Sequence, residues 1–213
     1  MSTEYGRIGT EVAQSFRNNN GIFTPQDIIE LDQENKWTNF GQLELIETQT
    51  VSSTVSAIDF QNIKQDTYTI HFVTYNNVQS TSDNKKIQVQ FFENGVLEIS
   101  NVYQVGTFTQ DAGGGSSVVT STGTTAIRVS DNTGNETNRK INGYFYCFYM
   151  GDSTKYPFLS FHGGSVDTIP NYQFEFGNGL MTQQSYVDGF RIALSGGNYT
   201  TGSSFSLYGI RSF

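Results

Sequence analysis

The stretch TYTIHFVTY, residues 67–75, decides the fold class of this chain. Along an extended strand, successive side chains point to opposite sides, so Ile70 and Phe72 face one way while Val73 and Tyr75 face the other. The segment is rich in Thr, Tyr, Val, Ile and Phe, which are the residues that favour strands. It therefore predicts a β-strand with apolar side chains on both of its faces.

The same pattern recurs from about residue 43 onward. Residues 86–92 alternate again, and Asn94-Gly95 predicts a tight turn into a returning strand at 96–100. The segment GYFYCFYM, residues 143–150, is apolar on both faces and predicts a central strand. We expect further strands at 55–60, 102–108, 125–130, 142–150, 157–161, 171–176, 186–194 and 203–210. About ten strands separated by turns predict an all-β fold, an antiparallel, jelly-roll-like β-sandwich.

The composition argues against several classes of protein. The chain has 213 residues, 14% aromatic and only 15% charged, with a net charge of −8. An acidic chain is a poor partner for nucleic acid, which attracts basic proteins. No apolar run approaches the ~20 residues of a membrane-spanning helix, so we expect no membrane insertion. The single cysteine, Cys147, excludes an internal disulfide and is expected to be a small buried core residue.

The first 45 residues differ from the rest and are expected to form an N-terminal arm, followed by a β-sandwich domain at 46–213. Thr24-Pro25-Gln26-Asp27 is a good helix start, which predicts one short helix at about 25–35. Spaced apolar residues favour an arm that orders against a partner, with a frayed tail as the alternative. The residues expected to anchor it are Tyr5, Ile8, Val12, Phe16, Phe23, Ile28, Leu31 and Trp37.

Residues 106–125 contain 14 Gly, Ser or Thr residues in 20, including Gly113-Gly114-Gly115. This composition predicts a long, mobile loop between two strands. No helix start with a lysine follows the glycines, so a phosphate-binding role is excluded.

Side chains that could carry catalysis are few. His71 lies inside a strand and is expected to be half-buried, and His162 before Gly163-Gly164 is expected in a turn. Alternation predicts that Asp59 and Glu175 both point to solvent, away from their aromatic neighbours. A glycosidase would need two carboxylates at a fixed separation, and a small glycan hydrolase is kept as a weaker alternative. The sequence favours a protein that is not an enzyme and needs no cofactor.

Two kinds of ligand contact remain open. The loop at 131–136, DNTGNE, is rich in oxygen ligands and could hold calcium, although an ordinary polar hairpin explains it better. No metal site is otherwise predicted. Tyr and Asn side chains near strand ends suit contacts with carbohydrate or protein. The candidates for such ligand contact are Tyr156, Tyr172, Asn198 and Tyr199.

Three stretches resemble virion structural proteins of tailed phages, especially marine ones. EYGRIGTEV with NNGIFTPQDIIEL resembles their opening, and GQLELIETQTVSSTVSAIDF running into YTIHFVTYNN resembles the start of their β-sandwich. The C-terminal GNYTTGSSFSLYGIRSF resembles their last strand. The match covers both ends and the first third, whereas the middle, roughly 80–185, agrees only in its strand pattern. Relatives of this kind are tail-fibre, tail-tip or head-decoration proteins.

The resemblance implies a non-enzymatic component of the phage particle surface, anchored by its arm and exposing the sandwich at the tail. Binding of host surface polysaccharide would fit a fibre, and a capsid decoration, cement or head-fibre protein that stabilises the head is the alternative. The expected partners are other virion proteins, tail or capsid, and further copies of the chain, with a trimer favoured by analogy. The resemblance identifies no catalytic residue.

Overall fold

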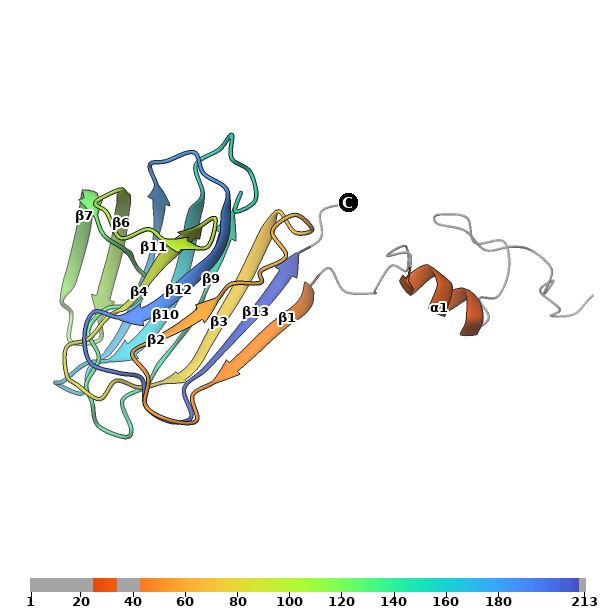
Figure 1. The fold of residues 1–213 in the computed structure, drawn as a ribbon. Helices are drawn as coiled ribbons and strands as arrows, with labels where there is room; N and C mark the ends of the chain where they lie inside the picture. Colours follow the sequence, from red (N-terminus) through yellow and green to blue (C-terminus); the bar gives the residue numbers. More distant parts are fainter. Residues whose placement is uncertain (1–24, 34–42, 211–213) are drawn as a thin grey trace, which may run out of the picture. The chain divides into compact units, whose positions relative to one another are not determined.

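The structure, a computed structural model, describes residues 25–33 and 43–210 (Figure 1). The chain divides into two units, Met1–Gln42 and Leu43–Phe213. In the first unit, helix α1 spans Pro25–Gln33, close to the expected 25–35. Of its apolar side chains, Ile28 is half-buried and Ile29 is exposed. The side chain of Leu31 lies outside the described part, as do Tyr5, Ile8, Val12, Phe16, Phe23 and Trp37.

The described part of the second unit is built of strands that pair in an antiparallel manner. These are β1 (Leu43–Thr50), β2 (Ala57–Phe60), β3 (Ile70–Val78), β4 (Ile87–Glu93), β5 (Val96–Leu97), β6 (Tyr103–Asp111), β7 (Ser116–Thr124), β8 (Ile127–Arg128), β9 (Ile141–Phe148), β10 (Phe158–Val166), β11 (Tyr172–Met181), β12 (Val187–Leu194) and β13 (Ser204–Ile210). The all-β prediction is thereby confirmed.

Two sheets pack against each other as a sandwich (Figure 1). The larger sheet has eight strands in the order β1-β13-β3-β9-β10-β11-β6-β7, with β1 and β7 at its opposite edges. The smaller sheet has the order β2-β12-β4-β5, and β8 also pairs with β4. The chain crosses between the sheets repeatedly, since β2 of the smaller sheet lies in sequence between β1 and β3 of the larger. The segment 143–150 supplies β9, which is central in the larger sheet, as predicted.

Aromatic side chains from both sheets fill the space between them. Phe145 on β9 meets Phe190 on β12, with ring centroids 5.8 Å apart, and Phe190 also contacts Phe60 on β2 at 5.3 Å. The hydroxyl of buried Tyr75 donates to the carbonyl of Val129 at 2.9 Å, which satisfies its polar atom. Burying each such ring stabilises the fold by roughly 2–3 kcal/mol, so this layer is what joins the two sheets.

The alternation in residues 67–75 is confirmed in β3. Val73 and Tyr75 are buried between the sheets, whereas Ile70 and Phe72 lie on the other face. The predicted turn at Asn94-Gly95 is confirmed as well, because both residues have positive φ and join β4 to β5. Cys147 is fully buried, as expected.

The mobile loop expected at 106–125 is wrong. Most of these residues belong to the hairpin of β6 and β7, and only the turn at 112–115 separates the strands. Thr and Val are β-branched and fit a pleated strand well, and this hairpin is rich in both. Gly114 has a φ of 95° in the turn, and the backbone N–H of Gly115 donates to Oδ1 of Asp111 at 3.0 Å. The composition identified the turn correctly but not its short extent.

The turn expected at His162-Gly163-Gly164 is also wrong, because these residues lie inside β10. Gly163 is opposite Gly143 of β9 in the register. A Cβ added to either glycine would collide with the Tyr75 ring or hydroxyl. These glycines therefore make room for a buried tyrosine within the sheet.

Candidate functional site

The outer face of the eight-stranded sheet carries no Asp, Glu, Lys or Arg side chain at the outward positions of its described strands. Residues opposite each other in the register share a face, and the positions next to buried ones point outward. The charged residues of these strands, Glu44, Glu47, Asp111 and Glu175, all occupy the inward-facing side. The outward positions hold aromatic, aliphatic, hydroxyl and amide side chains instead.

An aromatic band runs across this face from β1 to β9. We define it as Leu45, Phe72, Tyr144, Tyr146, Phe148 and Tyr208. Phe72 lies at its centre, with its ring centroid 4.8 Å from that of Tyr146, 5.7 Å from Tyr144 and 5.9 Å from Tyr208. Leu45, which is 55% exposed, is opposite Tyr208 in the register. Exposed apolar patches larger than a few hundred Å² are typical of interaction sites; here Leu45 and Tyr144 are the exposed members of the band, and the other four are half-buried.

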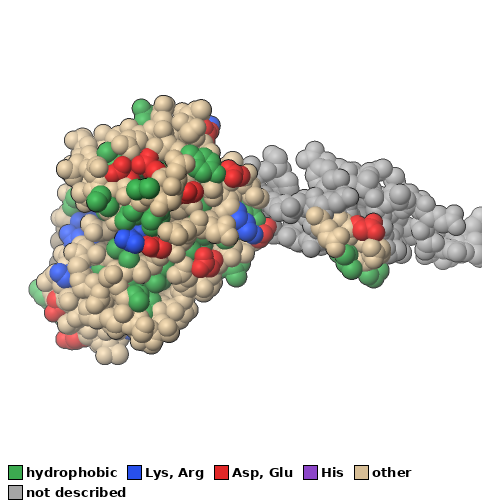
Figure 2. All heavy atoms as spheres, viewed as in Figure 1, with side chains coloured by type: hydrophobic (Ala, Val, Ile, Leu, Met, Phe, Trp, Pro, Cys, Tyr) green, Lys and Arg blue, Asp and Glu red, His purple; other side chains and the backbone are tan. Residues whose placement is uncertain are grey.

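The outer face of the five-stranded sheet has a different character. Asp59 on β2 and Arg191 on β12 are opposite each other and form a two-pronged ion pair, with both N–O distances 2.7 Å. About a third of each side chain is exposed, at 31% and 34%. The prediction that Asp59 points to solvent is therefore confirmed. Figure 2 shows one face of the sandwich, on which acidic and basic side chains are interspersed with hydrophobic ones.

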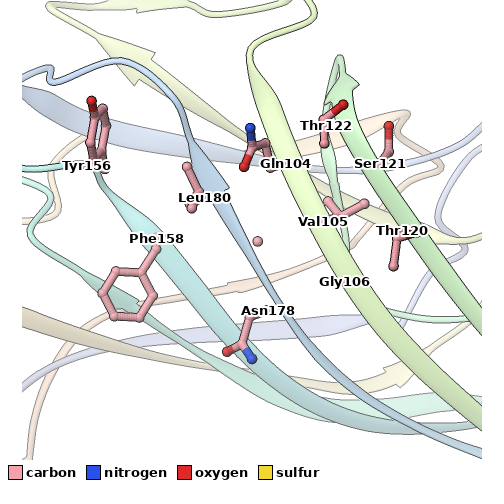
Figure 3. A pocket seen from close by; sticks show the side chains of 11 residues that line it. Gln104, Val105, Gly106, Thr120, Ser121, Thr122, Tyr156, Phe158, Asn178 and Leu180 are labelled. Carbon is pink, nitrogen blue, oxygen red and sulfur yellow. The ribbon is translucent and has the colours of Figure 1, made fainter.

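A groove lies on the uncharged face, beyond the aromatic band, over strands β10, β11, β6 and β7 (Figure 3). Its volume is about 740 Å³, within the range of small-molecule binding sites. Tyr156 and Phe158 stand on one side, and residues of β7 stand on the other (Figure 3). The lining residues are Gln104, Val105, Gly106, Thr120, Ser121, Thr122, Tyr156, Phe158, Asn178, Gly179 and Leu180.

Chemically, the groove combines ring surface with uncharged hydrogen-bonding groups. The Tyr156 ring is 51% exposed, and its expected role in ligand contact fits this position. Leu180 and Asn178 on β11 lie opposite Gln104 and Gly106 on β6, which brings an amide from each strand to the groove. The sequence did not predict this groove, because it depends on β6 and β7 lying next to β11.

A buried charge cluster lies on the inner side of the same sheet. Arg128 places its Nη2 2.8 Å from Asp131 and its Nε 3.2 Å from Glu175. Glu175 is 2% exposed, so the prediction that it faces solvent is wrong; its aromatic neighbours on β11 point outward instead. Neither Glu175 oxygen accepts a well-aligned hydrogen bond from the described residues. Burial, which outweighs the opposing effect of Arg128, raises the pKa of Glu175 to about 7.

The arrangement of these carboxylates does not suit a hydrolase. Glu175 and Asp131 share one arginine and are almost inaccessible, at 2% and 9% exposure. A glycosidase needs two carboxyl groups flanking a substrate, which neither residue can contact directly from this position.

Calcium at residues 131–136 is opposed by local positive charge. Arg128 and Lys86 both lie near Oδ1 of Asp131, at 2.8 Å and 3.9 Å. The same oxygen accepts from the backbone N–H of Asn132 at 2.7 Å. Over the described ranges 25–33 and 43–210, no group of three or more acidic, His or Cys side chains is placed to hold a metal.

The two histidines differ in their surroundings: one is buried and the other is exposed. His71 is fully buried rather than half-buried, and its Nε2 lies 2.7 Å from the carbonyl of Ile63. Burial lowers the pKa of His71. His162 is exposed on the outer face, with its ring centroid 5.8 Å from that of Tyr144. It therefore borders the aromatic band.

The remaining residues expected to contact a ligand are not brought together. Tyr172 is 56% exposed but lies at the opposite end of β11 from the groove. Asn198 lies in the β12–β13 loop, where its backbone N–H donates to Oγ1 of Thr81 at 3.0 Å. Tyr199 is fully buried against Phe205, with ring centroids 5.1 Å apart, so it cannot present its ring to a ligand.

Comparison with protein-family models, with curated proteins and with solved structures returned no match. Among the helical residues that the structure describes, no helix is long and apolar enough to cross a membrane.

Proposed function

We propose that this chain is a non-enzymatic structural protein of a bacteriophage virion. Its arm, which ends at residue 42 because β1 begins at Leu43, anchors it to other virion proteins, and its sandwich is exposed at the tail as a fibre or tail-tip component. The resemblance of both ends of the chain to virion proteins supports this proposal. The observation that carries it is the outer face of the eight-stranded sheet, which lacks charged side chains and bears the aromatic band.

A second copy of the chain is the proposed occupant of the aromatic band. The four strands from β1 to β9 span roughly 19 Å, and strands of this length reach about 25 Å, giving about 480 Å² for each copy. That area is typical of weak, reversible protein interfaces. Interface cores are depleted in charge and enriched in Tyr and Phe, which matches the band. Closed rings of identical copies are common, and a trimer is favoured by analogy with phage particles.

Two further observations support a role without catalysis. The buried carboxylates Glu175 and Asp131 are paired with Arg128, and the groove is lined by uncharged side chains. Neither arrangement supplies an accessible acid and base.

A capsid decoration or head-fibre protein is the second candidate. The same uncharged face is broad enough to lie on capsid subunits, and removal of such a protein would lower the stability of the phage head. The aromatic band is compatible with both candidates. The test must therefore show whether the protein lies on the tail or on the head of the particle.

Labelling of intact particles with an antibody raised against residues 46–213 tests the proposal. Label at the tail supports a fibre or tail-tip protein, whereas label over the head supports decoration. Particles that do not contain the chain, as measured by mass spectrometry, would contradict both. A chain that lacks residues 2–22 should keep its folded sandwich yet fail to enter particles, and normal incorporation would contradict the role of the arm.

A further inference from the structure

We propose that the groove over β10, β11, β6 and β7 binds an uncharged oligosaccharide. This inference rests on the proposed function, since a sandwich exposed on a particle can meet a surface polysaccharide. It names one site and one class of ligand, whereas the sequence offered only scattered residues for ligand contact.

The groove combines a suitable shape with exposed ring surface. The groove is open and about 740 Å³ in volume, enough for a short saccharide. Sugar rings have apolar faces that pack on aromatic rings, and Tyr156 offers a half-exposed ring on the wall of the groove. Phe158 and Leu180 continue this apolar surface toward its floor (Figure 3).

The polar side chains of the groove are free to bind a ligand. The side chains of Gln104, Asn178, Thr120 and Thr122 make no hydrogen bond with any residue that the structure describes. Other amides of the sandwich are engaged: Gln90 Nε2 donates to the Thr125 carbonyl at 3.0 Å, for example. Uncommitted amide and hydroxyl groups around a ring match the hydroxyl groups of a sugar, which both donate and accept.

The charge of the groove and of the chain selects the class of saccharide. No Asp, Glu, Lys or Arg lines the groove, so nothing there would pair with a uronate or sulfate. The chain also carries a net charge of −8, which repels polyanions. An uncharged oligosaccharide therefore fits better than an acidic one.

The groove also leaves room for the proposed assembly. The aromatic band covers β1, β13, β3 and β9, whereas the groove begins at β10 and extends to the edge strand β7. The two regions meet where Phe148 stacks on Phe158, with ring centroids 4.5 Å apart. A second copy on the band therefore need not cover the groove.

A larger side chain at Gly106 should block the groove without disturbing the fold. A Cβ at this position would meet no described atom within 4 Å, and no unusual backbone angle is required there. Gly106→Val should fold, because Val suits a strand better than Gly does, yet its side chain would occupy the groove. Tyr156→Ala removes the ring instead. Tyr172→Ala is the matched control, because Tyr172 is equally exposed but lies outside the groove.

The experiment is a titration of the full-length chain with neutral hexasaccharides of glucose, mannose or galactose, and with hexagalacturonate as the acidic probe. Calorimetry gives the affinity, and urea denaturation confirms that each variant is folded. We expect binding of at least one neutral hexasaccharide, weakened about tenfold or more by Tyr156→Ala and by Gly106→Val. Tyr172→Ala should bind like the wild type.

Three results would overturn the inference: no binding of any neutral probe, stronger binding of the acidic probe, or affinities unchanged by both groove variants. Each leaves the proposed function separately testable, because particle labelling and mass spectrometry do not depend on saccharide binding. If the chain is in the particle but binds no neutral saccharide, only this inference fails.

Discussion

The two outer faces of the sandwich differ in whether their outward side chains are charged. On the five-stranded sheet, Asp59 and Arg191 pair across neighbouring strands in contact with water. On the eight-stranded sheet, the charged residues lie on the inward side, and the outward positions hold aromatic and other uncharged side chains. A face that only meets water gains solubility from charges, whereas a face that meets another molecule must lose them on contact. The contrast is the basis for the proposal that the eight-stranded side makes the contact.

The largest expected effect on stability concerns the buried cluster of Arg128, Asp131 and Glu175 on the inner side of the eight-stranded sheet. Arg128→Met leaves Glu175 and Asp131 buried without their shared partner, and we expect it to lower the free energy of unfolding by about 3–5 kcal/mol at pH 8. Arg191→Met removes the corresponding partner of a pair that is about one-third exposed and should cost no more than about 1 kcal/mol. Urea denaturation of both variants measures the difference. Equal losses would mean that the two sides of the sandwich do not differ as described.

The next effect is a dependence of stability on pH. The pKa of Glu175 is raised from 4.5 to about 7 in the folded chain. Between these values the unfolded chain releases a proton that the folded chain keeps, so this residue makes stability fall as pH rises from about 4.5 to 7. The fall amounts to about 3 kcal/mol at 1.36 kcal/mol per pKa unit. Glu175→Gln, measured by urea denaturation across this range, should remove that part of the dependence. An unchanged profile in the variant would contradict it.

The smallest effect concerns the aromatic band in a single chain. Tyr146→Ala deletes a partly exposed ring that contacts Phe72 and Phe148, and we expect a loss of about 1 kcal/mol in a dilute sample. Phe145→Ala deletes the neighbouring buried ring and should cost about 3–5 kcal/mol. Thermal unfolding at low protein concentration compares them. A loss for Tyr146→Ala as large as for Phe145→Ala would mean that the band serves the core of one chain rather than contact with another.

Much of the fold followed from local sequence. Alternation assigned the two faces of β3 correctly, because side-chain direction in a strand depends only on position parity. The doubly apolar segment 143–150 located the central strand, and it also carried the signal of the aromatic band: Tyr144, Tyr146 and Phe148 point away from the core. Apolar character on both faces predicts a central strand, but it does not show that the outward rings form an exposed surface.

Other features could not be predicted because they depend on strand order. Glu175 is buried since Arg128, which comes from β8, reaches it across the interior, and no spacing in the sequence shows that approach. The groove needs β6 and β7 to extend the sheet beyond β11, whereas composition suggested a loop for the end of β6 and for all of β7. Tyr199 follows a glycine-rich turn as a surface residue would, yet it is buried against Phe205.

Sedimentation equilibrium of the full-length chain tests the central claim, that the aromatic band is an interface between copies. The wild type should associate, and Tyr146→Lys, which places an unpaired charge in the band, should weaken association about a hundredfold or more. Ala57→Lys is the control, since it adds the same charge on the outer face of the five-stranded sheet, and it should associate like the wild type. A wild type that stays monomeric at every concentration, or a Tyr146→Lys variant that associates normally, would contradict the claim.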